Sequence, residues 1–201
     1  MSSLALKSSI FTLLLVYSTI AYINPVQGVF DSPDPGVVYD GHFYYAATTG
    51  GWDGHYFPIW QSSNLFTWTQ KGWGFLNRPA WATRDFWAPE IHIVGHSYQM
   101  YYTATDTSGR LCIGVAYSDS PTGPYIDIGL PLLRNGTEGV IDPTIYQSGN
   151  GSIYLFYKVN GNAQGAPTEL HMIELSKDGR ELAGKNTFIF RTTLQYENGV
   201  V

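Results

Sequence analysis

The sequence predicts an all-β protein, specifically a β-propeller, because three of its features recur with a single period. Prolines recur at equal intervals, at Pro35, Pro89 and Pro143, and glycines recur with the same spacing, at Gly41, Gly95 and Gly149. Each glycine is followed by a run rich in aromatic residues, of which residues 43–48 are the first. A fixed period of this length, with several short strands in each repeat, is typical of propeller blades.

Each repeat divides into four predicted strands. The first strand follows the proline and ends near the glycine, and the second strand covers residues 43–48, 98–103 and 153–157. The third covers 57–62, 111–118 and 170–175, and a weaker fourth covers about 67–72, 124–128 and 188–193. Aromatic and β-branched residues favour strands, and the Gly, Pro and Asp residues between them favour turns. The polar segment 76–85 is predicted to be a surface loop between the first two repeats.

The repeats account for the whole chain after its N-terminal segment. Three repeats of equal period form one domain, residues 29–201, with no linker inside it. A propeller needs at least four blades to close, and residues 195–201 resemble the approach to a fourth blade. We therefore expect the domain to be incomplete at its C-terminus.

The composition narrows the possible functions. Charged residues make up 13% of the chain and the formal net charge is −5, whereas proteins that bind nucleic acids usually carry a basic face. Nucleic acid is therefore not an expected partner. Aromatic residues make up 15%, which suits a protein that handles neutral sugars and also suits any all-β core. The single cysteine, Cys112, excludes an internal disulfide and is predicted to be a buried small hydrophobic residue.

Residues 1–28 are predicted to form a secretory signal peptide. Lys7 supplies a positive charge, and the apolar run at 10–20 is too short to span a bilayer comfortably. A signal anchor is the alternative. Two glycosylation sequons begin at Asn135 and Asn150, in turn-rich segments. We expect a secreted, extracellular protein that makes no membrane contact once the signal peptide is removed.

The carboxylates at the start of the repeats are the main candidates for a functional site. In a propeller the first strand of each blade lines the central channel, so Asp34, Ala88 and Asp142 occupy equivalent positions that face a common axis. Glu90 follows two residues after Ala88. Two carboxylates facing one cleft are what glycoside hydrolysis requires, since one activates water while a partner protonates the leaving oxygen. The alternative role for each Asp is that of a turn former before proline.

Four segments together carry a resemblance to a known family. They are residues 34–38 followed by Tyr44-Tyr45, the turn at 58–68, the Trp-Ala-Pro-Glu-Ile run at 87–91, and the Val-Ile-Asp-Pro-Thr run at 140–144. In this order and spacing they resemble glycoside hydrolase family 43, whose members act on arabinan, arabinoxylan and xylan. The resemblance covers nearly all of the chain from about residue 30. It implies a five-bladed β-propeller, of which this chain holds about three blades.

The resemblance also implies roles for individual carboxylates. It makes Asp34 the general base that activates the attacking water, and Asp142 the residue that raises the pKa of the general acid and orients it. The family is inverting, which implies about 6.5–9.5 Å between acid and base. The acid in such enzymes is a Glu that opens the fourth blade, and here the chain ends just before that position. Glu197 is the nearest candidate, but its Asn-Gly-Val-Val context does not match the family pattern.

Two further residues are predicted to bind substrate. Trp87 is either a platform for a sugar ring or a core residue between blades, and Glu90 either faces substrate or pairs with a basic group such as Arg84. The histidines show no metal-ligand spacing and are interpreted as surface or turn residues: His55, His92, His96 and His171. We expect no metal and no cofactor, and a polysaccharide or oligosaccharide as the partner.

Several functions remain open at this point. The first is a secreted glycosidase that hydrolyses O-glycosyl bonds of arabinose-containing plant polysaccharides by inversion, and the second is a β-xylosidase of the same family. Retaining sucrose- or fructan-hydrolysing propellers are a third, although Ile141-Asp142-Pro143 lacks their Arg-Asp-Pro motif. A fourth is an inactive sugar-binding propeller remnant, because loss of the proton donor forfeits about 10²–10⁴ in rate.

Overall fold

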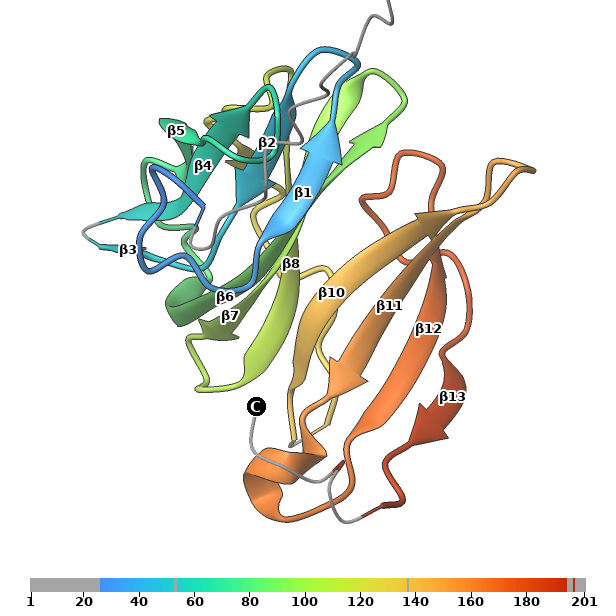
Figure 1. Ribbon diagram of the computed structural model, residues 1–201. Coiled ribbons are helices and arrows are strands. Elements are labelled where there is room, and N and C mark those ends of the chain that lie inside the picture. Colours follow the sequence, from blue (N-terminus) through green and yellow to red (C-terminus); the bar gives the residue numbers. More distant parts are fainter. Residues whose placement is uncertain (1–25, 53, 137, 195–196, 198–201) are drawn as a thin grey trace, which may run out of the picture.

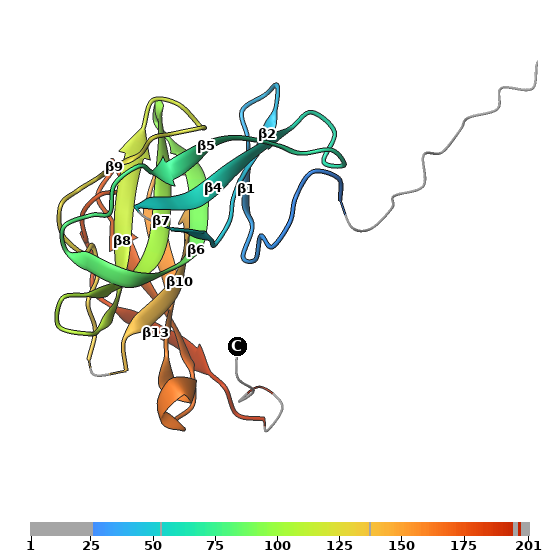
Figure 2. The same cartoon turned by 90° about the vertical axis from the view of Figure 1, so that its left-hand side faces the viewer.

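A computed structural model describes residues 26–52, 54–136, 138–194 and 197, and within them it consists of three antiparallel sheets. Residues 1–25, which carry most of the predicted signal peptide, lie outside the described residues. The sheets follow one another along the chain and sit side by side, as Figures 1 and 2 show. Each sheet is a meander of four main strands, so the predicted all-β, blade-like architecture is confirmed.

The first blade contains strands β1 (Gly36–Tyr39), β2 (Tyr44–Ala47), β4 (His55–Ser62) and β5 (Thr69–Phe75), which pair in that order. A two-residue strand, β3 (Gly51–Trp52), adds a short hairpin to the start of β4. The Asp40-Gly41 turn between β1 and β2 forms because the Asp40 carboxylate accepts hydrogen bonds from the amides of His42 and Phe43, each at 2.8 Å.

The second blade contains β6 (Ala82–Val94), β7 (Ser97–Asp106), β8 (Leu111–Ser118) and β9 (Ile126–Asp127). The prediction of a loop over residues 76–85 is wrong at its end, because β6 begins at Ala82. Ala82 is fully buried and pairs with Asp106, and Arg84 pairs with Thr105. Three register shifts interrupt this pairing between Ala82 and Glu90, and such bulges allow polar residues to continue a strand.

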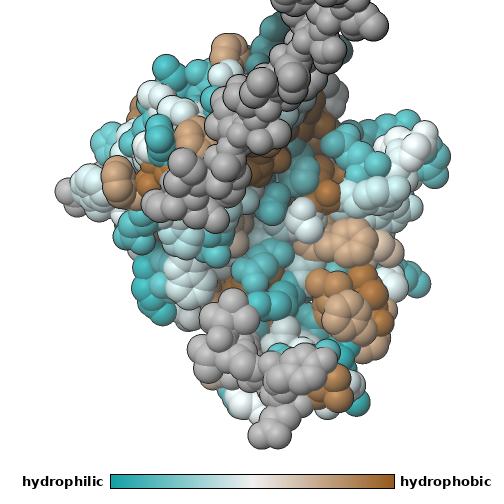
Figure 3. Space-filling view, viewed as in Figure 1, coloured by the Kyte–Doolittle hydropathy of each residue, from teal (hydrophilic) through white to brown (hydrophobic). Residues whose placement is uncertain are grey.

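The third blade contains β10 (Val140–Gln147), β11 (Ile153–Val159), β12 (Glu169–Leu175) and β13 (Thr187–Arg191). One turn of 3-10 helix, η1 (Gly161–Gln164), lies between β11 and β12. Figure 3 shows a hydrophobic patch on the surface over this blade. In β13, Phe188 and Phe190 are both more than half exposed. No helix in the described part of the chain is both long and apolar enough to cross a membrane.

Two hydrophobic cores join the three blades. The core between the first and second blades includes Phe57, Met100 and Tyr102, and the core between the second and third includes Tyr101 and Leu155. Successive residues of β7 therefore point into different cores, as expected for a strand with both faces covered. This explains why the second predicted strand reads as an almost continuous apolar run.

Cys112 is fully buried in the first of these cores, and it is a free thiol. Burial raises the pKa of its thiol to about 11, and the nearby Asp106 carboxylate acts in the same direction. The prediction of a buried small hydrophobic residue at this position is confirmed.

The turn after β7 supplies a prediction about acid stability. Asp106 is almost fully buried, and its carboxylate accepts hydrogen bonds from the Ser108 amide and hydroxyl and from the Arg110 amide, at 2.7–3.1 Å. Burial alone would raise the pKa of Asp106, but these hydrogen bonds and the charge of Arg134 outweigh it and lower the pKa below its ordinary value of 3.8. Ionised Asp106 therefore stabilises the fold at neutral pH, and the stabilisation is lost as pH falls through its folded pKa.

We expect Asp106→Asn to lower the free energy of unfolding by about 1–3 kcal/mol at pH 7. The difference from the wild type should shrink as pH falls below 3.8. Urea unfolding at pH 7 and at several acidic values measures both effects. A difference that does not change with pH would contradict this account of the carboxylate.

Candidate functional site

The first strands of the three blades meet at one cavity. β6 packs against both β1 and β10, and the cavity of about 250 Å³ lies beside the first residues of β1 and β10 and the middle of β6. Asp34, Glu90 and Asp142 line it, together with Pro35, Ala88, Pro143 and Thr144. The structure therefore brings together the three carboxylates that the sequence singled out, and Figure 3 shows hydrophilic surface along the middle of this face.

The backbone at the three repeat starts is left-handed. Asp34, Ala88 and Asp142 have φ angles of 53°, 45° and 55°, a region that costs roughly 1–2 kcal/mol for a residue with a side chain. Three residues earlier in each repeat, Asp31, Asp85 and Gly139 also have positive φ. The chain therefore turns sharply at the same two places in every repeat, before β1, inside β6 and around the start of β10. Residues 34, 88 and 142 share this geometry and all line the cavity.

Hydrogen bonds between blades hold these turns. The amide of Ala88 donates to the Thr49 hydroxyl of the first blade at 2.8 Å, and the amide of Asp142 donates to the Thr103 hydroxyl of the second blade at 3.1 Å. Thr49 and Thr103 stand at equivalent positions in successive repeats, so the bond is part of the repeat. In both cases the second-strand region of one blade fixes the first strand of the next.

The backbones of β1 and β6 approach each other closely beside the cavity. A Cβ atom on Gly36 would lie 2.3 Å from the Pro89 carbonyl oxygen and 2.8 Å from the Glu90 Cα, distances that no side chain can occupy. Glycine at this position therefore allows β1 to lie directly against β6. This contact places Asp34 and Glu90 on the same cavity.

Asp142 has a basic partner that the sequence analysis missed. The Lys158 ammonium lies 2.8 Å from Asp142 Oδ2, and the lysine side chain is only 19% exposed. Lys158 is on β11, directly opposite Ile141 in the antiparallel register. Opposite charges at this distance attract each other, so Lys158 restrains the position of the Asp142 side chain. No sequence motif marks this lysine, because the contact depends on the strand register.

Glu90 does not pair with Arg84, the basic group that the sequence analysis named as an example, and a histidine lies beside it instead. Arg84 contacts Asp85 at 3.1 Å, whereas Glu90 lies 3.5 Å from the His92 Nε2 atom. The interpretation of the histidines as surface or turn residues is wrong for two of them. His92 lies half-buried in β6, and His171 is buried in β12, where it contacts the Glu169 carboxylate at 2.9 Å.

Trp87 lies beside the carboxylate cavity and does not line it. It borders a neighbouring cavity of about 330 Å³ together with Thr49, Tyr56 and Arg84. Its side chain is 39% exposed, so it is not fully packed in a core. Thr49 borders this second cavity and also hydrogen bonds to Asp34, and it therefore connects the two cavities.

Comparison with known proteins decides the family. The family described as glycosyl hydrolases family 43 matches residues 22–200. The chain belongs to family 43.

Individual proteins are also similar to this chain. The chain is 32% identical to a thermostable family-43 glycoside hydrolase of known structure, with a TM-score of 0.77 over 88% of this chain and 58% of the other. An endo-arabinase from Bacteroides thetaiotaomicron, 22% identical, shares the fold with a TM-score of 0.71 over 80% of this chain and 56% of the other. A xylosidase/arabinosidase from Humicola insolens is 32% identical over 77 residues, which are 38% of this chain and 23% of that protein. The matches thus span less than two thirds of each of these relatives.

Glu197 has the wrong surroundings for the general acid of a family 43 enzyme. Its carboxylate accepts hydrogen bonds from the amides of Thr193 and Leu194, each at 2.9 Å, and it is exposed. These amides, with Leu194 contributing most, lower the pKa of Glu197. A general acid needs a raised pKa, so Glu197 serves the turn instead. Residues 198–201 lie outside the described residues.

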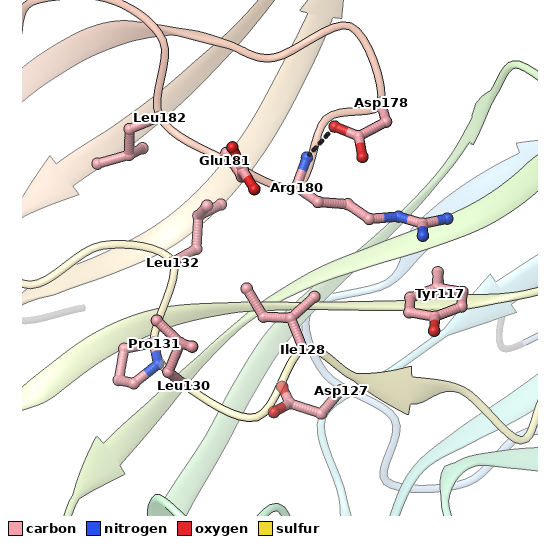
Figure 4. Close-up of a pocket in the computed structure, with 10 residues that line it drawn as sticks. All are labelled: Tyr117, Asp127, Ile128, Leu130, Pro131, Leu132, Asp178, Arg180, Glu181 and Leu182. Carbon is pink, nitrogen blue, oxygen red and sulfur yellow. Dashed lines mark hydrogen bonds between the residues drawn. The ribbon is translucent and has the colours of Figure 1, made fainter.

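A larger cavity of about 570 Å³ contains none of the residues predicted for the family 43 site. It lies between the second blade and the turn that follows β12, and Figure 4 shows Asp178 and Arg180 on one side and Tyr117 and Ile128 on the other. The Arg180 guanidinium sits 3.7 Å above the Tyr117 ring, a cation–π contact that joins the blades. Among the described residues, no group of three His, Cys, Asp or Glu could hold a metal ion.

Proposed function

We propose that this family 43 protein is a glycosidase that hydrolyses O-glycosyl bonds of arabinose- or xylose-containing plant polysaccharides. The observation that carries the proposal is the cavity that Asp34, Glu90 and Asp142 line together. Carboxylates on one cavity are the groups that glycoside hydrolysis uses, and the family assignment supports the same chemistry.

In the proposed reaction Asp34 is the general base. Its carboxylate takes a proton from a water molecule while the water oxygen forms a bond to the anomeric carbon, and the bond from that carbon to the leaving oxygen breaks. The leaving oxygen receives a proton from a general acid. Attack on the face opposite the leaving group inverts the anomeric configuration.

Asp142 acts on the acid in this proposal and does not react itself. A carboxylate that stays ionised raises the pKa of a neighbouring acid, because two like charges close together are unfavourable. The Lys158 ammonium, 2.8 Å from Asp142 Oδ2, holds this carboxylate in place at the cavity. Trp87, on the adjacent cavity, offers an exposed indole face for a neighbouring sugar ring, and Glu90 offers hydrogen-bond acceptors to sugar hydroxyls.

Two sugars are candidates for the unit that the enzyme releases. Arabinofuranosyl units are the first candidate, and xylosyl units are an equally supported alternative, because the relatives from Humicola insolens and Bacteroides ovatus are each named as both xylosidase and arabinosidase. Secretion is proposed from the apolar segment at residues 10–20 and the preceding Lys7. An extracellular location suits a polymeric plant substrate.

The test is a panel of substrates with the full chain. Arabinan, arabinoxylan and xylan are incubated with the protein, together with 4-nitrophenyl α-L-arabinofuranoside, 4-nitrophenyl β-D-xylopyranoside and sucrose. We expect release of arabinose or xylose and no cleavage of sucrose. Proton NMR of the first product formed should show the inverted anomer. A product of retained configuration, or cleavage of sucrose alone, would overturn the proposal.

A 2,4-dinitrophenyl glycoside distinguishes a chain that lacks only the general acid from a chain that has no active site. Its leaving group needs little protonation, so a chain with the base but without the acid should cleave it and leave the polysaccharides intact. That pattern would support the inactive-remnant alternative for natural substrates. A chain inactive on both kinds of substrate would contradict the assignment of Asp34 as the base.

A further inference from the structure

We propose that Thr49 is a positioning residue that fixes the Asp34 carboxylate and determines which of its oxygens accepts the proton. The inference rests on the proposed role of Asp34 as the general base. It is carried by a set of hydrogen bonds that joins Thr49 to both walls of the cavity.

Thr49 is anchored on three sides. Its hydroxyl donates to Asp34 Oδ2 at 2.7 Å, and the same hydroxyl accepts the amide proton of Ala88 at 2.8 Å. Its own amide donates to the Pro33 carbonyl at 3.0 Å. Thr49 therefore connects the segment that carries Asp34 to the first strand of the second blade.

The direction of the hydroxyl bond is fixed by its partners. A threonine hydroxyl has one proton to donate and lone pairs to accept with. The Ala88 amide can only donate, so it takes a lone pair and leaves the hydroxyl proton for Asp34. Hydrogen bonds arranged in such a chain strengthen one another, and the rotamer of Asp34 is thereby held.

This arrangement leaves one carboxylate oxygen for chemistry. Asp34 Oδ2 is occupied by Thr49, and within the described part of the chain Oδ1 accepts no hydrogen bond. Asp34 is exposed and lines the cavity. Oδ1 is therefore the oxygen that takes the proton of the attacking water, and Thr49 sets its position.

The next repeat provides an internal comparison. Thr103 occupies the position equivalent to Thr49, and its hydroxyl accepts a hydrogen bond from the Asp142 amide at 3.1 Å. The Asp142 carboxylate, however, binds Lys158, and among the described residues Thr103 donates no hydrogen bond to it. The bond to the neighbouring amide is thus common to both threonines, whereas within the described ranges of the chain Thr49 alone of the two also binds a carboxylate.

The test compares Thr49→Val, Thr49→Ser and the matched control Thr103→Val in the full chain. The Val variants each remove one bond between blades, so their unfolding midpoints should shift by similar amounts. Side-chain couplings measured by NMR should show a single Asp34 rotamer in the wild type, Thr49→Ser and Thr103→Val, and averaging among rotamers in Thr49→Val. On an aryl glycoside substrate, Thr49→Val should lower kcat on the order of 10- to 100-fold with little change in KM, and Thr49→Ser should restore it.

Two results would overturn the proposal. One is a fixed Asp34 rotamer in Thr49→Val, and the other is an equal loss of kcat in Thr49→Val and Thr103→Val. If the wild type cleaves no glycoside, the proposed function fails, and the rotamer measurement still decides whether Thr49 positions Asp34.

Discussion

Asp34→Asn is expected to lower kcat by about 10²–10⁴-fold on aryl arabinofuranosides or xylosides. Asparagine keeps the size of the side chain and can still accept the Thr49 hydroxyl bond, but its amide cannot take a proton from water. The left-handed backbone at this position also tolerates asparagine. The loss should therefore appear in kcat, with KM and the unfolding midpoint nearly unchanged.

Asp31→Asn is the matched control for this substitution. Asp31 is also an exposed aspartate with a left-handed backbone, at φ 43°, but it does not line the cavity. Its replacement should leave kcat close to that of the wild type. Equal losses in the two variants would indicate a general charge effect and would contradict the role of Asp34 as the base.

Tyr102→Ala is expected to cause the largest loss of stability, about 3–5 kcal/mol in the free energy of unfolding. Tyr102 is fully buried at the centre of the core between the first two blades. Its ring lies 5.1 Å from Phe75 and 5.5 Å from Phe57, in edge-on geometry. Alanine would leave a cavity that these rigid rings cannot fill.

The Tyr102 hydroxyl adds a second contribution. It donates to Asp127 Oδ2 at 2.5 Å, and the Trp81 indole donates to the other carboxylate oxygen at 3.1 Å. Burial raises the pKa of Asp127, which shows that its carboxylate is poorly solvated by water. Loss of the Tyr102 hydroxyl would therefore leave a carboxylate oxygen without a donor and lower the free energy of unfolding. Tyr102→Phe should therefore cost about 1–3 kcal/mol.

Chemical unfolding of both variants measures the two effects, with Ile126→Ala as the control. Ile126 is 61% exposed in the same blade, and its replacement should change stability by less than about 0.5 kcal/mol. A Tyr102→Ala loss no larger than that of Tyr102→Phe would show that the ring packing contributes little, against our expectation.

Much of the fold could be predicted because the repeat consists of residues with strong conformational preferences. Proline, glycine and aromatic runs recur with one period. The glycines fall in turns and the aromatic runs in core strands, whereas the prolines precede β1 and lie inside β6 and β10. The start of β6 was missed because Arg84 and Asp85 are polar, and polarity usually indicates a loop. Their place in the strand depends on pairing with β7 across bulges, which a local pattern does not reveal.

Some residues of the candidate site could also be predicted from the sequence, and others could not. Asp34 and Asp142 could be placed on one cavity because they share a position in the repeat. Lys158 could not, because its contact with Asp142 follows from which residues of β10 and β11 lie opposite each other. Thr49 precedes Thr103 by one full period, so the repeat contained a signal for it, but a threonine at the end of a strand has many uses.

Ala88 shows that the left-handed backbone at these positions does not depend on a carboxylate side chain. It adopts the same backbone conformation as Asp34 and Asp142, at φ 45°, and like Asp142 it is supported by a threonine of the preceding blade, yet its methyl group has no catalytic capacity. The strained turn is thus a property of all three blades, and the reactive groups are additions to it. Such a protein can gain or lose a carboxylate at its centre by a single substitution without rebuilding the scaffold, so divergence of chemistry can proceed blade by blade while the architecture stays constant.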